Sequence, residues 1–90
     1  MKYEELDKRA IVVLAEDWAG VYVDGMCIGQ GHSFDEVLYG HDSLTALKIA
    51  TEYNLKYEDF FFVDEEDLTD ITWDSESYGG FPQQLKAFWT

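Results

Sequence analysis

The chain has 90 residues, 19 of them acidic and 6 basic, so its formal net charge at pH 7 is −13. This length predicts one domain, spanning residues 1–90, with a core of its own. An aromatic content of 17% argues against a disordered acidic chain, which would hold few such residues. The charge disfavours nucleic acid and anionic membranes as partners and favours basic protein surfaces.

The first part of the chain predicts two or three strands. Residues 10–16, AIVVLAE, are apolar and β-branched, which is typical of a buried strand. Residues 21–29, VYVDGMCIG, hold Asp24 and Gly25 between two apolar flanks. Because an Asp-Gly pair tolerates positive φ angles, this segment predicts a tight hairpin.

Two helices are expected next. Ser33 and Glu36 have the spacing of an N-terminal capping box, which predicts a short helix over residues 34–39. A second helix is expected over residues 44–54. The apolar residues expected on its inward face recur at helical spacing: Leu44, Leu47, Ala50 and Tyr53.

The last part of the chain predicts one more strand and one more helix. Residues 56–63 are aromatic and branched, as in a strand. A short helix is expected to begin at Pro82 and to turn Leu85, Phe88 and Trp89 inward. The expected fold is therefore α+β: a small antiparallel sheet of three or four strands, with two or three short helices on one face.

Acidic residues are concentrated where the last strand ends, in FFFVDEEDLTD (60–70). Residues 56–76 contain nine acids: Glu58, Asp59, Asp64, Glu65, Glu66, Asp67, Asp70, Asp74 and Glu76. Ordered carboxylates can imitate the dense charge of duplex nucleic acid, so this run predicts a docking surface for a basic groove. The alternative interpretation is a solvated loop that keeps the protein soluble. Calcium binding is disfavoured because the run has no glycine and lacks the spacing of a calcium loop.

The strand before these acids is expected to be buried on one side. Side chains alternate between the two faces of a strand. Either Phe60 with Phe62, or Phe61 with Val63, should therefore face the core while the strand holds the acids in place.

Trp73 and Tyr78 lie inside the acidic stretch, where burial is hard to arrange. They are candidate anchors of an interface, since Trp and Tyr are common hot-spot residues. His32 and His41 match no zinc pattern, and Cys27 lies in an alternating strand where cysteine packs as a small hydrophobe. We expect no catalytic residue, no metal and no cofactor.

Residues 17–38 and FPQQL (81–85) carry a resemblance. A turn W-x-G precedes a Y-V-D-G hairpin and a G-H-S helix start, and FPQQL contains a Pro-x-x-Leu pattern. This arrangement resembles small acidic proteins encoded by bacteria and their phages. Size and acidity are also similar to those of phage host-takeover and anti-defence proteins. The resemblance implies a bacterial or phage origin and passes on no activity.

The expected function is binding and inhibition of a basic-grooved protein that acts on nucleic acid, such as a host or defence protein. Alternatives are an immunity or antitoxin-like protein that caps a nuclease toxin, or a structural assembly subunit. Direct binding to nucleic acid or membrane is not expected, and the protein should be a monomer or homodimer. A single cysteine and no apolar run of about 18 residues indicate a soluble protein of a reducing, intracellular compartment. Together with the bacterial or phage origin that the resemblance implies, the expected location is the cytoplasm of a bacterial host cell.

Overall fold

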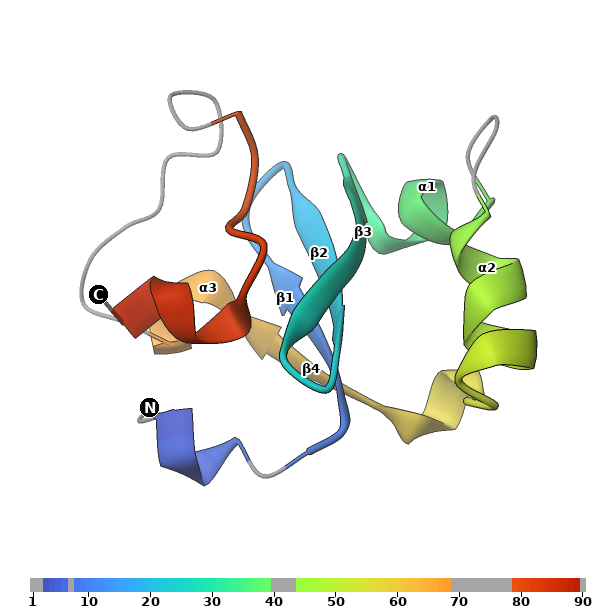
Figure 1. Cartoon of the computed structure of the whole chain (residues 1–90). Coiled ribbons are helices and arrows are strands. Elements are labelled where there is room, and N and C mark those ends of the chain that lie inside the picture. Colours follow the sequence, from blue (N-terminus) through green and yellow to red (C-terminus); the bar gives the residue numbers. More distant parts are fainter. Residues whose placement is uncertain (1–2, 7, 40–43, 69–78, 90) are drawn as a thin grey trace.

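The computed structural model describes residues 3–6, 8–39, 44–68 and 79–89. Within them, a four-stranded sheet of order β3-β2-β1-β4 separates two groups of helices (Figure 1). The strands are β1 (Ala10–Leu14), β2 (Ala19–Val23), β3 (Met26–Gly31) and β4 (Phe60–Asp64). The helices and helical turns are η1 (Tyr3–Glu5), α1 (Phe34–Tyr39), α2 (Thr45–Leu47), η2 (Lys48–Glu52), η3 (Tyr57–Asp59), α3 (Glu65–Leu68) and η4 (Leu85–Trp89). These elements confirm the expected α+β class.

The predicted hairpin is present between β2 and β3. These strands are antiparallel, with Val23 opposite Met26. Asp24 and Gly25 connect them with φ angles of 51° and 83°. Both φ angles are positive, as a tight two-residue turn requires. An Asp-Gly pair tolerates such angles, which is why its presence in the sequence predicts the hairpin.

The capping box is also confirmed, with one difference. The Ser33 hydroxyl accepts a hydrogen bond from the Glu36 N–H at 3.1 Å, so Ser33 caps the start of α1. The Glu36 carboxylate accepts from the N–H of His32, one residue before the position that a standard box uses. Both bonds satisfy main-chain donors where the helix begins.

The sheet is mixed, so the expectation of a wholly antiparallel sheet is wrong. β4 runs parallel to β1, with Ala10 opposite Phe60 and Leu14 opposite Asp64. β2 pairs with the other edge of β1, so that edge is already taken. The chain crosses over the sheet through α1, α2 and η2 before it returns, and such a crossover produces a parallel pair.

Helices cover both faces of the sheet, so the expectation of helices on one face is also wrong (Figure 1). The buried residues of one face, here called the α1 face, are Ala10, Val12, Ala19, Val21, Val23, Phe34, Val37, Leu38, Ile49 and Phe60. Those of the opposite face, the α3 face, are Leu6, Ile11, Val13, Tyr22, Val63, Leu68, Phe81, Leu85 and Phe88. Successive residues of β1 alternate between the two sets. A continuous apolar strand of this kind needs cover on both sides.

The helix formed by α2 and η2 turns a different side inward than expected. Leu44 and Leu47 are 64% and 60% exposed, whereas Thr45 and Ile49 are buried. Thr45 packs on β3 at Gly29, where an added Cβ would lie 2.6 Å from the threonine hydroxyl. Because the helix comes close to the sheet at Gly29, it buries the side that carries Thr45. The more apolar Leu44 and Leu47 therefore remain exposed.

The C-terminal segment packs on the α3 face. Leu85 and Phe88 are buried, as predicted, and Trp89 is partly buried. The helical turn begins at Leu85 and not at Pro82. The rings of Trp89 and Tyr3 pack edge-on, with their centroids 5.4 Å apart, so η1 and η4 lie side by side (Figure 1).

The same segment is fastened to the sheet by Tyr22, which is fully buried. Its hydroxyl donates a hydrogen bond to the main-chain oxygen of Pro82 at 2.6 Å. Phe81 lies over Gly20, where an added Cβ would be 2.7 Å from the ring. The segment before η4 is therefore held by one polar bond and one close ring contact.

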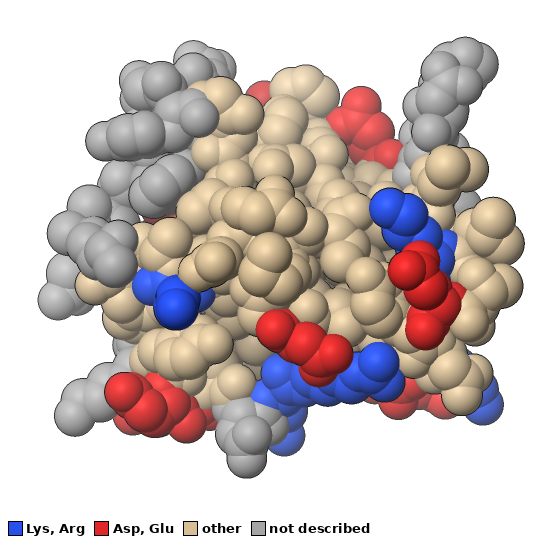
Figure 2. All heavy atoms as spheres, in the orientation of Figure 1, with Lys and Arg blue, Asp and Glu red and all other residues tan. Residues whose placement is uncertain are grey.

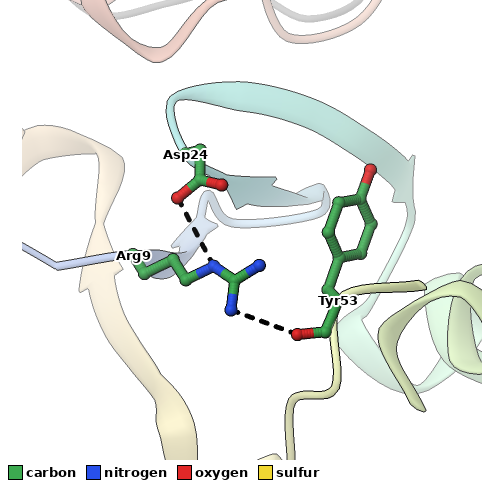
Figure 3. A network of polar contacts seen from close by, with 3 residues as sticks. All are labelled: Arg9, Asp24 and Tyr53. Atoms are coloured by element: carbon green, nitrogen blue, oxygen red, sulfur yellow. Dashed lines mark hydrogen bonds and ion pairs between the residues drawn. The ribbon is translucent and has the colours of Figure 1, made fainter. Parts of the chain in front are cut away.

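Arg9 connects three parts of the fold (Figure 3). Its Nε atom lies 3.5 Å from the Asp24 carboxylate, and its Nη1 donates to the main-chain oxygen of Tyr53 at 3.1 Å. These contacts join the start of β1, the hairpin turn and the residue after η2. They help to set the path by which the chain approaches η3 and β4.

Candidate protein-binding surface along β4

β4 is an edge strand, held in place at both ends. It pairs with β1 on its inner side. At its start, η3 is closed by a hydrogen bond from the Lys56 N–H to the Asp59 carboxylate at 2.7 Å, and the Asp59 N–H donates to the Lys56 oxygen at 2.9 Å. At its end, the chain passes directly into α3. The strand therefore has a defined position although it lies at the edge of the sheet.

The two edges of the sheet differ. The C-terminal segment covers the start of the outer edge of β3, where the Cys27 N–H donates to the Gln83 oxygen at 2.8 Å. In the turn just before this strand, the Leu85 N–H donates to the Gly25 oxygen at 2.9 Å. In the described ranges, no strand or segment pairs with the outer edge of β4. Alternate main-chain groups of an edge strand point outward and can pair with another chain.

Aromatic side chains flank this edge. Tyr57 is 66% exposed, and Phe61 and Phe62 are 38% and 37% exposed. The ring of Phe62 lies 5.1 Å from that of Phe34, edge-on, and 5.7 Å from that of Tyr57. Phe34 is buried in α1, so the half-exposed rings rest on a fixed base.

The prediction for the phenylalanines is wrong. Neither alternating pair is buried as a unit: Phe60 and Val63 are buried, and Phe61 and Phe62 between them are exposed. Phe60 faces the α1 face and Val63 the α3 face, because both sides of the sheet are covered. At an edge strand that cover is incomplete, and one residue on each side remains open to solvent.

The described acids form two groups at opposite ends of β4. Glu58 and Asp59 precede the strand, and Asp64, Glu66 and Asp67 follow its last apolar residue; all five side chains are exposed. Five residue steps separate Asp59 from Asp64, which corresponds to about 17 Å along an extended strand. The charge thus brackets the aromatic surface.

Glu65 differs from its neighbours. It is the first residue of α3 and is buried, only 7% exposed, so it does not belong to the exposed acids. The other predicted site residues lie outside the described residues: Asp70, Trp73, Asp74, Glu76 and Tyr78. We use the name β4 surface for the exposed side chains of Tyr57, Glu58, Asp59, Phe61, Phe62, Asp64, Glu66 and Asp67.

Tyr57, Phe61 and Phe62 were missed as surface residues. The available signal was the aromatic run itself. A strand with three phenylalanines in succession cannot hide all of them unless it is central, and the adjoining acids indicate proximity to solvent.

The cysteine and the described histidine lie in surroundings that do not favour catalysis. Burial raises the pKa of the Cys27 thiol, which reduces the fraction of reactive thiolate at neutral pH. Nδ1 of His32 lies 3.8 Å from the Asp17 carboxylate, and both side chains are largely exposed. His41 lies outside the described residues. Among the residues whose positions are described, no three His, Cys, Asp or Glu side chains are grouped to hold a metal ion.

The opposite side of the molecule has a different character. In Figure 1 β3 passes in front of β4, and Figure 2 shows this same side as spheres. Its described surface is mainly uncharged, with acidic and basic side chains scattered around it. The two acidic groups of the β4 surface belong to the other edge of the sheet.

The fold and this surface define a small α+β protein with an acidic, aromatic edge strand. Comparison with protein-family models, curated proteins and solved structures found no match. Within the described ranges, none of the helices has the length and apolar character needed to cross a membrane.

Proposed function

We propose that the protein binds and inhibits a protein with a basic groove, an enzyme or factor that acts on nucleic acid. Its setting would be the cytoplasm of a bacterial cell, in a phage anti-defence or DNA-mimic role. The resemblance of residues 17–38 to small acidic bacterial and phage proteins supports this setting. The net charge of −13 supports a basic partner.

The observation that carries the proposal is the arrangement of the β4 surface. Exposed acids stand at both ends of a fixed strand, and half-exposed aromatic rings lie between them. Separated carboxylates on a rigid element lose less entropy on binding than the same charges on a loose chain. They carry the same sign of charge as the phosphates that a basic groove normally meets.

Charge and aromatic rings would contribute differently to binding. Complementary charge mainly speeds association and sets the salt dependence. Buried aromatic side chains act as hot spots and slow dissociation. The β4 surface provides both, with Glu58 and Glu66 as outer charges and Tyr57 and Phe62 as adjoining rings.

The test begins with capture from a bacterial lysate on the immobilised protein at low and high salt. A captured protein should bind nucleic acid, lose its activity at a stoichiometric amount of inhibitor, and be displaced by duplex DNA. The double variant Glu58→Gln/Glu66→Gln should associate more slowly and show a flatter salt dependence. The matched control Glu4→Gln/Glu52→Gln removes the same charge from exposed positions outside the β4 surface. If the captured protein binds DNA and inhibitor at the same time, the proposal is wrong.

The nature of the captured partner also separates the inhibitor of a host or defence protein from the immunity-type alternative. A nuclease whose toxicity is neutralised would favour the latter. In both cases the acids and aromatic rings of the β4 surface would contact a basic groove of the partner.

A second candidate, an assembly subunit, is favoured by one observation. Leu44 and Leu47 lie three residues apart and are both strongly exposed. Two leucines on one helical surface can bury against a second copy. Sedimentation of wild type and of Leu44→Ser/Leu47→Ser would show a dimer that the variant loses.

A further inference from the structure

The outer edge of β4, which no described residue pairs with, carries a more specific inference that rests on the function proposed above. We propose that the partner contributes an extended basic segment that adds to this edge as a fifth strand. Recognition would then combine main-chain hydrogen bonds with charge, and would not depend on charge mimicry alone.

Among the described residues, the two edges of the sheet differ in how they are covered. Residues 83–85 cover the start of the outer edge of β3 through a main-chain hydrogen bond at Cys27 and a side-chain bond from Gln83 to the Cys27 oxygen at 3.1 Å, and they also bond to Gly25 in the turn before it. For β4, the described part of the chain provides no such cover. An edge strand with this exposure is a template for strand addition.

Aromatic side chains lie on either side of the β4 edge. β4 has five residues, enough to pair with a short extended peptide. Phe62, with Tyr57 beside it, projects on the α1 face, and Phe61 projects on the α3 face. Alternate side chains of an added strand would therefore meet an aromatic ring on each face, which is how strand addition gains specificity.

The charge around β4 distinguishes two occupants of its outer edge, a second copy of this chain and a basic segment of another protein. Pairing β4 antiparallel with a second copy about Phe62 would bring the acids that precede the strand, Glu58 and Asp59, close to those that follow it in the other copy, so that acids would meet at both ends. Like charges directly opposite each other are destabilising. A strand with Lys or Arg near both ends would instead meet an acid at each end, so the occupant is a basic segment of another protein.

The same acids have a simpler interpretation that the test must address. Charged residues beside an exposed edge protect it from pairing and aggregation. On that interpretation, basic peptides are attracted to the surface without main-chain pairing. Binding by strand addition requires the N–H groups of the peptide main chain, whereas binding by charge alone does not.

The probe is a capped peptide of alternating lysine and valine, Lys-Val-Lys-Val-Lys-Val-Lys. Two control peptides have the same sequence and charge, one N-methylated at the valines and the other at the internal lysines. Alternate residues of a strand direct their N–H groups to the same side, so only one control can retain the bonds to β4. Binding is followed by amide chemical shifts and hydrogen exchange of the whole protein.

We expect the parent peptide to shift amides of residues 57–66 and to slow exchange of outward N–H groups in β4. One N-methylated peptide should bind about tenfold more weakly or worse, and the other nearly as well as the parent. The charge reversal Glu58→Lys/Glu66→Lys should abolish binding. Its matched control, Glu4→Lys/Glu52→Lys, should retain most of it.

Equal binding of all three peptides, with no protection of β4 amides, would overturn strand addition while leaving the proposed function intact. A peptide that binds no better to wild type than to Glu58→Lys/Glu66→Lys would count against the basic-partner function as well. A concentration-dependent dimer whose interface protects the β4 amides would replace the proposed occupant with a second copy.

Discussion

Phe60 and Val63 are the two buried residues of β4, and they face opposite sides of the sheet. Phe60 belongs to the core of the α1 face, where its ring lies 6.0 Å from that of Phe34. Val63 belongs to the core of the α3 face together with Leu68. The strand is thus anchored on both faces, and Phe61 and Phe62 between these anchors are exposed.

This arrangement predicts a difference between two phenylalanines that are close in sequence. Phe60→Ala should lower the free energy of unfolding by about 3–5 kcal/mol, as for other buried rings. Phe62→Ala should cost clearly less, because over a third of Phe62 is already exposed. Urea denaturation of both variants measures the difference. Equal losses would mean that Phe62 is as much a core residue as Phe60.

The hydrogen bond from Tyr22 to Pro82 should stabilise the fold measurably. Tyr22→Phe leaves the Pro82 oxygen without this donor, and a loss of about 1–3 kcal/mol is expected. Tyr57→Phe is the matched control, because Tyr57 is 66% exposed. A control variant as unstable as Tyr22→Phe would show that the buried hydrogen bond is not the cause.

Tyr22 also predicts a stability change at alkaline pH. Burial, followed by the neighbouring Cys27, raises its pKa well above the ordinary value of 10.0. Above about pH 10 the unfolded chain therefore releases a proton that the native state retains. This contribution to stability is present below that pH and is lost as the pH rises further.

The measurement compares unfolding of wild type and Tyr22→Phe between neutral and alkaline pH. Wild type should lose stability more steeply, since the variant lacks the titrating hydroxyl. Parallel curves would contradict this account of Tyr22.

The excess of acids predicts that moderate salt stabilises the protein. Raising the salt from about 0.01 M to about 0.15 M shortens the screening length from about 30 Å to about 8 Å and weakens repulsion among the carboxylates. The midpoint of urea unfolding should increase with salt, and Glu58→Gln/Glu66→Gln should show a smaller increase. A decrease with salt would mean that ion pairs such as Arg9 with Asp24 outweigh the repulsion.

The fold is expected to form without metal. The sequence contains neither a zinc pattern nor a calcium loop, so we predict that no metal contributes to folding. Thermal unfolding with and without EDTA should give the same melting temperature. A large decrease with EDTA would place a metal site in the chain.

Local features of this protein could be predicted from the sequence because neighbouring residues determine them. Asp24 and Gly25 tolerate the positive φ angles of their turn, and Ser33 caps α1 within a few residues of its own position. The burial of Leu85 and Phe88 follows from helical spacing. The concentration of acids around β4 could also be predicted, because it can be read directly from the order of residues.

Features that depend on distant contacts were decided by the tertiary structure. β4 lies parallel to β1 because the chain crosses the sheet before it returns, and no local pattern specifies that route. Which side of the α2 helix is buried was decided by the space at Gly29, which admits Thr45 and leaves Leu44 outside. The exposure of Phe61 and Phe62 has the same origin. Hydrophobicity favours the burial of every phenylalanine, but only the position of a strand in its sheet determines how much cover each face receives.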